Sequence, residues 1–271
     1  RRVKYYDTSM EDNVEKHLKL EFKLRKSLTN GCEGFEVYYQ PIIDAKTDKW
    51  VGVEALSRWA DDEHGLVMPS VFVPLAESLD LINKLDRWVL NTAMHQLLES
   101  GLLHDGEFSL SVNMSALNMN EPHLIDDIKS MVDKAGYPPE QLVMEVTEST
   151  AIVDMQKAAS KLTQIRELGI RTAMDDFGTG FSSLYNMKNM PVDTLKIDRA
   201  FVQELTNDGF NQAFIKTISM LAHTRGMRVC AEGVENARQK DILVDKDSDY
   251  LQGFLFGRPM PLDELMIKAA Q

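Results

Sequence analysis

Eight short apolar segments, most of them separated by amphipathic stretches of helical length, constrain the fold of this chain more than any other feature. The segments have the length of buried strands, and most are rich in β-branched or aromatic residues. They lie at 35–43, 50–58, 108–114, 142–147, 171–175, 194–198, 228–232 and 250–254. Helical patterns fall between most of them, for example at 83–100, 123–135, 154–168 and 211–225. This alternation predicts an α/β fold, and eight strands favour a (β/α)8 TIM-type barrel over an open α/β sheet.

The connection between the first two segments is too short for a regular barrel. Only residues 44–49 separate them, whereas a crossover between parallel strands takes a dozen residues or more. We therefore expect an antiparallel hairpin, which makes the barrel irregular with an antiparallel first strand. A further helix is predicted at 11–30, where apolar residues recur among charged ones until Gly31 ends the pattern.

Composition excludes some classes of protein. The net charge is −12, from 42 acidic and 30 basic side chains, which argues against a protein that grips long nucleic acid through a basic surface. No apolar run approaches the roughly 20 residues that span a bilayer, and residues 1–10 carry no signal-peptide core. The two cysteines, Cys32 and Cys230, lie far apart and fit a reduced setting. We expect a cytoplasmic domain, either free or as the cytoplasmic part of a larger, membrane-attached protein.

Most of the predicted strands contain or end in a polar residue that a buried strand does not favour. Burying an unpaired charge costs several kcal/mol per ion, so these groups must meet one another or a metal ion. In a barrel the carboxyl ends of the strands converge on one mouth. Unrelated caps and ion pairs explain any one of these residues well, but they explain seven strands together poorly. The residues are Glu54, Asn113, Glu145, Asp175, Asp176, Lys196, Glu232 and Gln252.

An oxygen-rich cluster of this kind suits hard divalent cations such as Mg²⁺ or Mn²⁺. Five carboxylates are more than one Mg²⁺ usually takes from a protein. Two ions about 3.5–4 Å apart would use them better, and such a pair clamps the attacking and leaving oxygens of phosphoryl transfer. Zinc is disfavoured because no histidine or cysteine pair has ligand spacing. The residues alone therefore favour a two-metal site.

Eight motifs, in register from about residue 33 to the end of the chain, resemble the EAL domain family. The family takes its name from a signature that matches Glu54-Ala55-Leu56, here within the string 53–59. The motifs are Tyr39-Gln40-Pro41-Ile42, Val53-Glu54-Ala55-Leu56-Ser57-Arg58-Trp59, Ser111-Val112-Asn113-Met114-Ser115, Glu145-Val146-Thr147-Glu148, Asp175-Asp176-Phe177-Gly178-Thr179-Gly180, Leu195-Lys196-Ile197-Asp198, Ala231-Glu232-Gly233-Val234-Glu235 and Gln252-Gly253-Phe254.

The resemblance implies a (β/α)8-type barrel with one antiparallel strand and an activity in bacterial second-messenger signalling. Members of the family hydrolyse cyclic di-GMP to the linear dinucleotide pGpG, using two Mg²⁺ or Mn²⁺ ions. The implied metal ligands are Glu54, Asn113, Glu145, Asp175, Asp176 and Glu232. Lys196 matches the lysine that holds and helps to activate the attacking water, and the implied substrate contacts are Gln40, Leu56, Arg58 and Gln252. Glu235 matches a residue that steadies the loop 175–183, which links the metals to a dimer interface.

The expected domain organisation follows from the same resemblance. Residues 31–271 match the EAL phosphodiesterase domain, and residues 1–30 are expected to be a linker and helix. The string at 3–7 resembles the last strand of a diguanylate-cyclase (GGDEF) domain, so an upstream GGDEF-like or sensory domain is expected, as is a homodimer. Two alternatives to an active phosphodiesterase remain: a catalytically weak sensor that binds cyclic di-GMP, and a protein-interaction module. The presence of every implied metal ligand favours catalysis.

Overall fold

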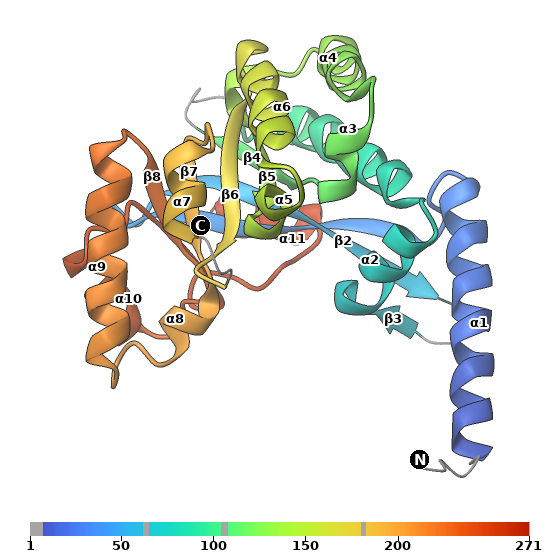
Figure 1. The fold of residues 1–271 in the computed structure, drawn as a ribbon, viewed down its shortest axis with the longest axis horizontal. Helices are drawn as coiled ribbons and strands as arrows, with labels where there is room; N and C mark the ends of the chain where they lie inside the picture. The colour runs from blue at the N-terminus through green and yellow to red at the C-terminus, as the bar shows by residue number, and fades with distance from the viewer. Residues whose placement is uncertain (1–7, 62–64, 104–107, 180–182, 271) are drawn as a thin grey trace. The chain divides into compact units, whose positions relative to one another are not determined.

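The computed structural model describes residues 8–61, 65–103, 108–179 and 183–270 (Figure 1). The chain forms two compact units, one made of Arg1–Glu36 with Ser57–Trp88 and the other of Val37–Leu56 with Val89–Gln271. The GGDEF-like string at 3–7 lies outside the described residues. The predicted division into 1–30 and 31–271 concerns domains rather than compact units, and it stays a prediction.

The second unit is built around a closed barrel. Within the described residues, all eight predicted strands are present. In spatial order they are β1 (Phe35–Asp44), β9 (Tyr250–Gln252), β8 (Arg228–Ala231), β7 (Thr194–Ile197), β6 (Arg171–Phe177), β5 (Leu142–Thr147), β4 (Ser109–Asn113) and β2 (Trp50–Asp61). A pairing of β1 with β2 closes the ring, so the barrel prediction is confirmed and the open-sheet alternative is wrong.

The first strand runs against its neighbour, as the sequence predicts. β1 pairs antiparallel with β9, whereas β2 and β4 to β9 follow one another in parallel. The cause is the tight turn after β1. The side chain of Asp44 accepts hydrogen bonds from the backbone nitrogens of Lys46 at 3.1 Å and Thr47 at 2.8 Å, and Asp48 adopts a left-handed φ of 59°. The chain therefore reverses within a few residues and enters β2 directly.

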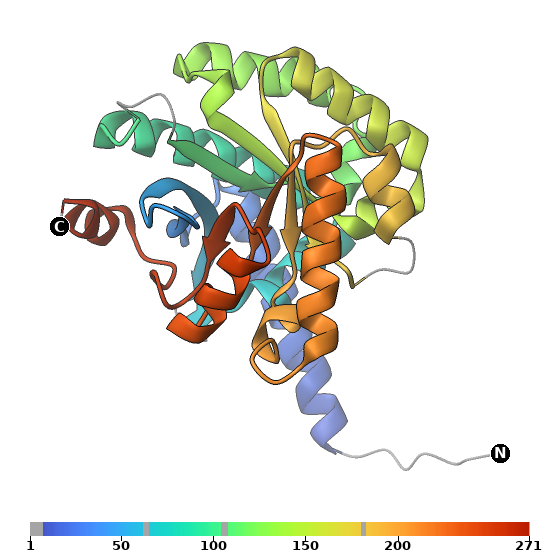
Figure 2. The same cartoon turned by 90° about the vertical axis from the view of Figure 1, so that its left-hand side faces the viewer.

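Helices lie outside the strands of this unit, and α9 and α10 are seen in front of β8 in Figure 2. Helix α6 packs on β6 and α9 on β8. The four helices predicted between the strands correspond to α3, α4, α6 and α9, and the helix predicted at 11–30 corresponds to α1. The helices that accompany or follow the barrel strands are α3 (Ile82–Ser100), η1 (Ala116–Asn120), α4 (Leu124–Ala135), η2 (Pro139–Gln141), α5 (Glu148–Val153), α6 (Met155–Glu167), α7 (Ser183–Asn189), α8 (Arg199–Gln203), α9 (Gly209–Thr224), α10 (Ala237–Asp245) and α11 (Leu262–Ala269).

The first unit contains α1 (Thr8–Thr29), β3 (Gly65–Val67) and α2 (Pro69–Ser78). Its core holds a stack of Phe35 on Trp59, with ring centroids 5.7 Å apart, and Phe72 meets both rings edge-on. β3 pairs antiparallel with the end of β2. This pairing extends β2 to Asp61, beyond the predicted end at residue 58. A three-residue strand is too short to show a periodic pattern, which is why β3 was not predicted.

Gly52 provides a test of the barrel packing. It lies on β2 opposite Ser109 of β4, and a Cβ atom there would stand 2.5 Å from the Ser109 carbonyl oxygen. We predict that Gly52→Ala lowers the free energy of unfolding by about 1–3 kcal/mol, because the two strands must move apart. Gly209→Ala at the start of α9 is the control, since nothing lies within 4 Å of its Cβ position. Urea unfolding followed by circular dichroism measures both, and equal midpoints for the two variants would refute the close approach.

Candidate active site

Lys196, on β7, is enclosed by four carboxylates from four other segments of the barrel. Its Nζ atom lies 2.6 Å from Glu145 Oε2, 2.7 Å from Glu232 Oε1, 3.2 Å from Glu54 Oε2 and 3.7 Å from Asp175 Oδ1. The side chain of Lys196 is only 2% exposed, so water does little to screen these charges. We call these five residues the Lys196 cluster. One ammonium among four carboxylates leaves an excess of negative charge in a buried place.

Glu54 connects this cluster to the amides of the mouth. Asn113 Nδ2, at the end of β4, donates to Glu54 Oε1 at 2.6 Å, and Gln252 Nε2, at the end of β9, donates to Glu54 Oε2 at 2.7 Å. Gln252 Nε2 also lies 3.1 Å from Gln40 Oε1, and Gln40 donates to the carbonyl of Gly257. The structure therefore brings together residues of seven strands (β1, β2, β4, β5, β6, β7 and β9) and of the segment after β8, as the strand-end argument predicts.

Burial, together with the neighbouring charges, shifts the pKa values of the cluster. Burial raises the pKa of Glu145 to about 8, against the opposing effect of Lys196, and it raises the pKa of Glu232 well above its usual value. Burial also opposes the charge on Lys196, but Asp175 and the other carboxylates overcome it and raise the Lys196 pKa well above the usual value. For Glu54 burial acts upward, yet Lys196 and the amide hydrogen bonds leave its pKa lowered. Lys196 therefore keeps its positive charge, and the cluster contains more carboxylates than one ammonium group can neutralise.

The next acidic residues along the chain add to this charge. Asp176 follows Asp175 in a left-handed conformation with φ 55°, and its backbone nitrogen donates to Asp175 Oδ1 at 2.9 Å. Burial, together with Asp175 and Asp198, raises the pKa of Asp176 to about 6. Asp198, which caps α8 by accepting from Ala200 N, was not singled out from the sequence. Its position directly after β7 is the signal that could have identified it.

Comparisons with known proteins agree with this geometry. The family model described as "EAL domain" matches residues 23–259. The chain belongs to the EAL domain family. It is 37% identical over 269 residues to the bifunctional diguanylate cyclase/cyclic di-GMP phosphodiesterase MucR of Pseudomonas aeruginosa, covering 98% of this chain and 38% of that protein. The chain spans between 32% and 41% of the length of the curated relatives it matches.

Solved EAL structures share the fold. The MucR phosphodiesterase in complex with c-di-GMP is 38% identical, with a TM-score of 0.82 over 90% of this chain and 99% of that one. The EAL enzyme Bd1971, in a form with bound cAMP and cyclic-di-GMP, is 30% identical, with a TM-score of 0.88 over 95% of this chain and 70% of that one. An EAL domain protein from Listeria monocytogenes is 32% identical, with a TM-score of 0.80 over 90% of this chain and 95% of that one.

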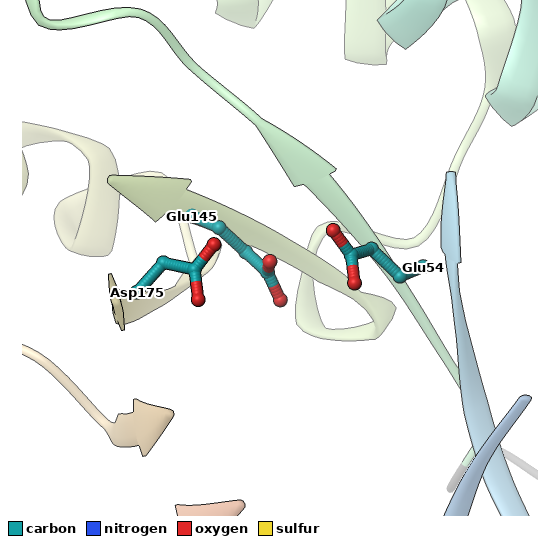
Figure 3. A group of neighbouring side chains, drawn as sticks. All are labelled: Glu54, Glu145 and Asp175. Carbon is teal, nitrogen blue, oxygen red and sulfur yellow. The ribbon is translucent and has the colours of Figure 1, made fainter. Parts of the chain in front are cut away.

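The donor set of this EAL domain fits a hard divalent cation. Glu54, Glu145 and Asp175 each offer a carboxylate oxygen, and these oxygens all lie within 4.8 Å of one another. Figure 3 shows the three carboxylates turned toward one another from three separate strands. Carboxylate and amide oxygens are the ligands that Mg²⁺ and Mn²⁺ prefer, and added positive charge would relieve the repulsion around Lys196. The residues therefore could hold metal, and nothing in the geometry selects one of the two ions.

A pocket of about 210 Å³ opens at the carboxyl ends of the strands, next to the cluster. Seven predicted site residues line it, and its lining also includes Arg199, Gln203 and Phe254, to which the sequence analysis assigned no role. Arg58 belongs to the other compact unit, where its guanidinium donates to the carbonyl of Ser57. The predicted residues that line the pocket are Gln40, Glu54, Leu56, Asp175, Glu232, Glu235 and Gln252.

The loop after β6 is held by a residue that sequence reasoning missed. Glu148, 1% exposed, accepts hydrogen bonds from Gly178 N at 3.1 Å and from Asn186 Nδ2 at 3.2 Å. Gly178 has a left-handed φ of 102°, and a Cβ there would meet the Phe201 ring at 2.4 Å. Glu235 is exposed, and the hydroxyl of Thr179 donates to Asp176 O. Residues 180–182 of the loop lie outside the described residues, so the role of Glu235 stays a prediction.

Two further observations bear on the setting of the domain. No helix in the described part of the chain is both long enough and apolar enough to cross a bilayer. Cys32 and Cys230 are free and buried. The cytoplasmic location predicted from the sequence stays a prediction.

Metal binding to the cluster can be tested without any substrate. We predict that saturating Mg²⁺ or Mn²⁺ stabilises the domain by about 2–3 kcal/mol at roughly 100 times its dissociation constant, because only the folded chain assembles the ligands. Differential scanning calorimetry in chelator and in metal should show a rise in Tm of about 5 °C or more. Glu145→Gln should remove most of the rise, and Glu264→Gln, exposed on α11 beside Lys268, should keep it. Equal rises in the two variants would remove Glu145 from the metal site.

Proposed function

We propose that this EAL domain hydrolyses cyclic di-GMP to linear pGpG with the aid of two Mg²⁺ or Mn²⁺ ions. The convergence of four buried carboxylates on Lys196 beside a pocket carries the proposal. The family supports it, since the similar protein MucR is named a cyclic di-GMP phosphodiesterase and its phosphodiesterase structure holds c-di-GMP. Since the curated relatives that it matches are longer than this chain, we propose that the domain acts as part of a longer protein, with an upstream GGDEF-like or sensory domain.

The chain's own residues divide into three roles in this proposal. The first group would hold the metal ions, and Asn113 would do so through its amide oxygen once its nitrogen leaves Glu54. When bound, the ions would neutralise charge that develops on the phosphate and lower the pKa of a bound water. The proposed metal-holding residues are Glu54, Asn113, Glu145, Asp175, Asp176 and Glu232.

Lys196 would position the attacking water. A lysine ammonium offers three N–H donors, and the carboxylates around Lys196 fix its place and keep it charged. In the reaction the water oxygen forms a bond to phosphorus, one water proton is lost, and the bond from phosphorus to the ribose 3′ oxygen breaks. The leaving 3′ oxygen takes up a proton, which gives a dinucleotide with a 5′ phosphate.

The substrate would lie over the pocket beside Leu56. Gln40 and Gln252, which are hydrogen-bonded to each other, would contact its polar groups. Arg58 has the guanidinium fork that suits a phosphate, and its contact with the dinucleotide is part of the proposal. The strand arrangement alone does not specify cyclic di-GMP over other cyclic nucleotides, so product analysis has to decide it.

Turnover of cyclic di-GMP tests the proposal directly. We predict that Lys196→Met and Asp175→Asn each lower kcat at least ~100-fold while substrate affinity changes little, because both residues act chiefly in the transition state. Lys216→Met is the control, since Lys216 is exposed and pairs with Asp247 on the surface. Chromatography of pGpG gives kcat, and calorimetric titration in Ca²⁺ gives affinity. Tight binding by the unmodified domain with no pGpG in either metal would establish the sensor alternative instead.

We further propose that the domain acts as a homodimer and that the loop 175–183 couples the dimer contact to the metals. The loop begins with two proposed metal-holding residues and leads into α7, where Leu184 is 57% and Tyr185 63% exposed. Two loop states that differ by a few kcal/mol would allow an upstream domain to switch activity. Glu148 accepts hydrogen bonds from Gly178 and Asn186, and these bonds would stabilise one of the two states.

Two matched variants separate the glutamates that could steady this loop. We predict that Glu148→Gln raises the Mg²⁺ concentration that gives half-maximal turnover about tenfold or more. The reason is that an amide is a weaker acceptor for the Gly178 N–H than a carboxylate. Glu235→Gln should lower activity at low Mg²⁺ only if Glu235 also contacts the loop. Mg²⁺ titrations of turnover compare the two, with circular dichroism to check the fold. If Glu148→Gln requires no more Mg²⁺ than the unmodified domain, the loop is not held through Glu148.

A further inference from the structure

A second cavity lies inside the barrel, on the side away from the pocket at the mouth. Its volume is about 490 Å³, and its lining comes from β1, β2, β4 to β9 and residue 140. Arg171, Thr194 and Tyr250 stand at the amino-terminal starts of their strands and are partly exposed. Glu145 and Lys196 form the inner end, where they are 1% exposed. The cavity therefore runs from the amino-terminal rim of the barrel to the Lys196 cluster.

The cavity exists because small residues occupy the middle of the barrel. Barrel interiors of this type are usually filled by layers of bulky branched side chains. Here Ser111, Ala173 and Cys230, all of which line the cavity, are the register partners of Glu54, Glu145 and Lys196 on the neighbouring strands. The wall also carries the hydroxyls of Ser109 and Thr194. At roughly 30 Å³ per molecule, such a space holds on the order of ten waters, and its polar wall can bind them.

The cavity and the pocket at the mouth adjoin at the cluster. Among the described residues, none lines both of them. Lys196 and Glu145, 2.6 Å apart, face the cavity, and Lys196 also contacts Glu54 and Glu232, which face the pocket. Arg171 at the rim is held in place, since its Nε donates to the carbonyl of Glu140 at 3.0 Å.

We propose that this cavity is a water route that supplies the Lys196 cluster from the amino-terminal face of the barrel. The inference rests on the proposed hydrolysis, which consumes one water in each turnover. A dinucleotide over the mouth covers the pocket on that side, so replacement water has to come from another direction. The cavity provides that direction, and it ends at the lysine that would position the water.

Access to Cys230 from the rim tests the route without any catalysis. Methyl methanethiosulfonate transfers its methylthio group to a thiolate and releases methanesulfinate, so peptide mass spectrometry can follow labelling of Cys230, with Cys32 as an internal reference for unfolding. We predict that Thr194→Phe, which narrows the rim, slows labelling of Cys230 about tenfold or more relative to Cys32. Thr194→Val, which keeps the volume, should leave it unchanged. Val51→Phe at the same rim replaces Thr194→Phe if circular dichroism shows that the latter does not fold.

The same variants are then assayed for turnover, and cyclic di-GMP with Ca²⁺ is added to the labelling reaction. We predict that the bound dinucleotide leaves labelling of Cys230 unchanged, and that Thr194→Phe lowers kcat several-fold with KM within about twofold, since water supply does not affect substrate binding. Labelling that the rim variants do not slow, or that the dinucleotide abolishes, overturns the route. A different outcome separates the route from the proposed function. If the rim variants slow labelling but neither they nor the unmodified domain cleaves cyclic di-GMP, the cavity is open to reagent from the rim and the proposed hydrolysis is wrong.

Discussion

The ammonium of Lys196 among four buried carboxylates is the interaction on which the rest of the structure depends. Bringing these groups together out of water is costly, and a single cation does not compensate it. The barrel forces the charges together because the strand ends that carry them converge. The hydrogen bonds that Asn113 and Gln252 donate to Glu54 offset part of the free-energy cost. The same excess of negative charge attracts divalent cations. The repulsion that destabilises the cluster without metal is therefore also the reason that the cluster suits a metal ion.

The surrounding fold serves to hold this arrangement. The tight turn at Asp44 reverses β1, so that Gln40 reaches Gln252 at the mouth. Glu148 at the start of α5 fixes Gly178, just after the two aspartates of β6. Small residues on the neighbouring strands leave the inside of the barrel partly open. Lys196 therefore lies between the cavity and the pocket at the mouth.

Much of this could be predicted from the sequence, because the signals are local. Apolar runs marked all eight barrel strands, the short link at 44–49 marked the reversed one, and polar residues at strand ends marked the cluster. The three-residue β3 escaped because it is too short to show a period. Glu148 escaped because its partner Gly178 is 30 residues away, and no pattern within one segment shows that the two residues meet. The cavity could not be foreseen, since it depends on which small residues share a level across neighbouring strands.

Counting bound Mn²⁺ tests the central claim most directly. Electron paramagnetic resonance of the domain titrated with Mn²⁺ reports both the number of bound ions and whether two ions lie close enough to couple. The account predicts two coupled Mn²⁺ ions per chain in the unmodified domain, and loss of the coupled signal in Glu54→Gln, whose carboxylate contacts Lys196, Asn113 and Gln252. Absence of bound Mn²⁺, or a coupled pair that survives unchanged in Glu54→Gln, would contradict it.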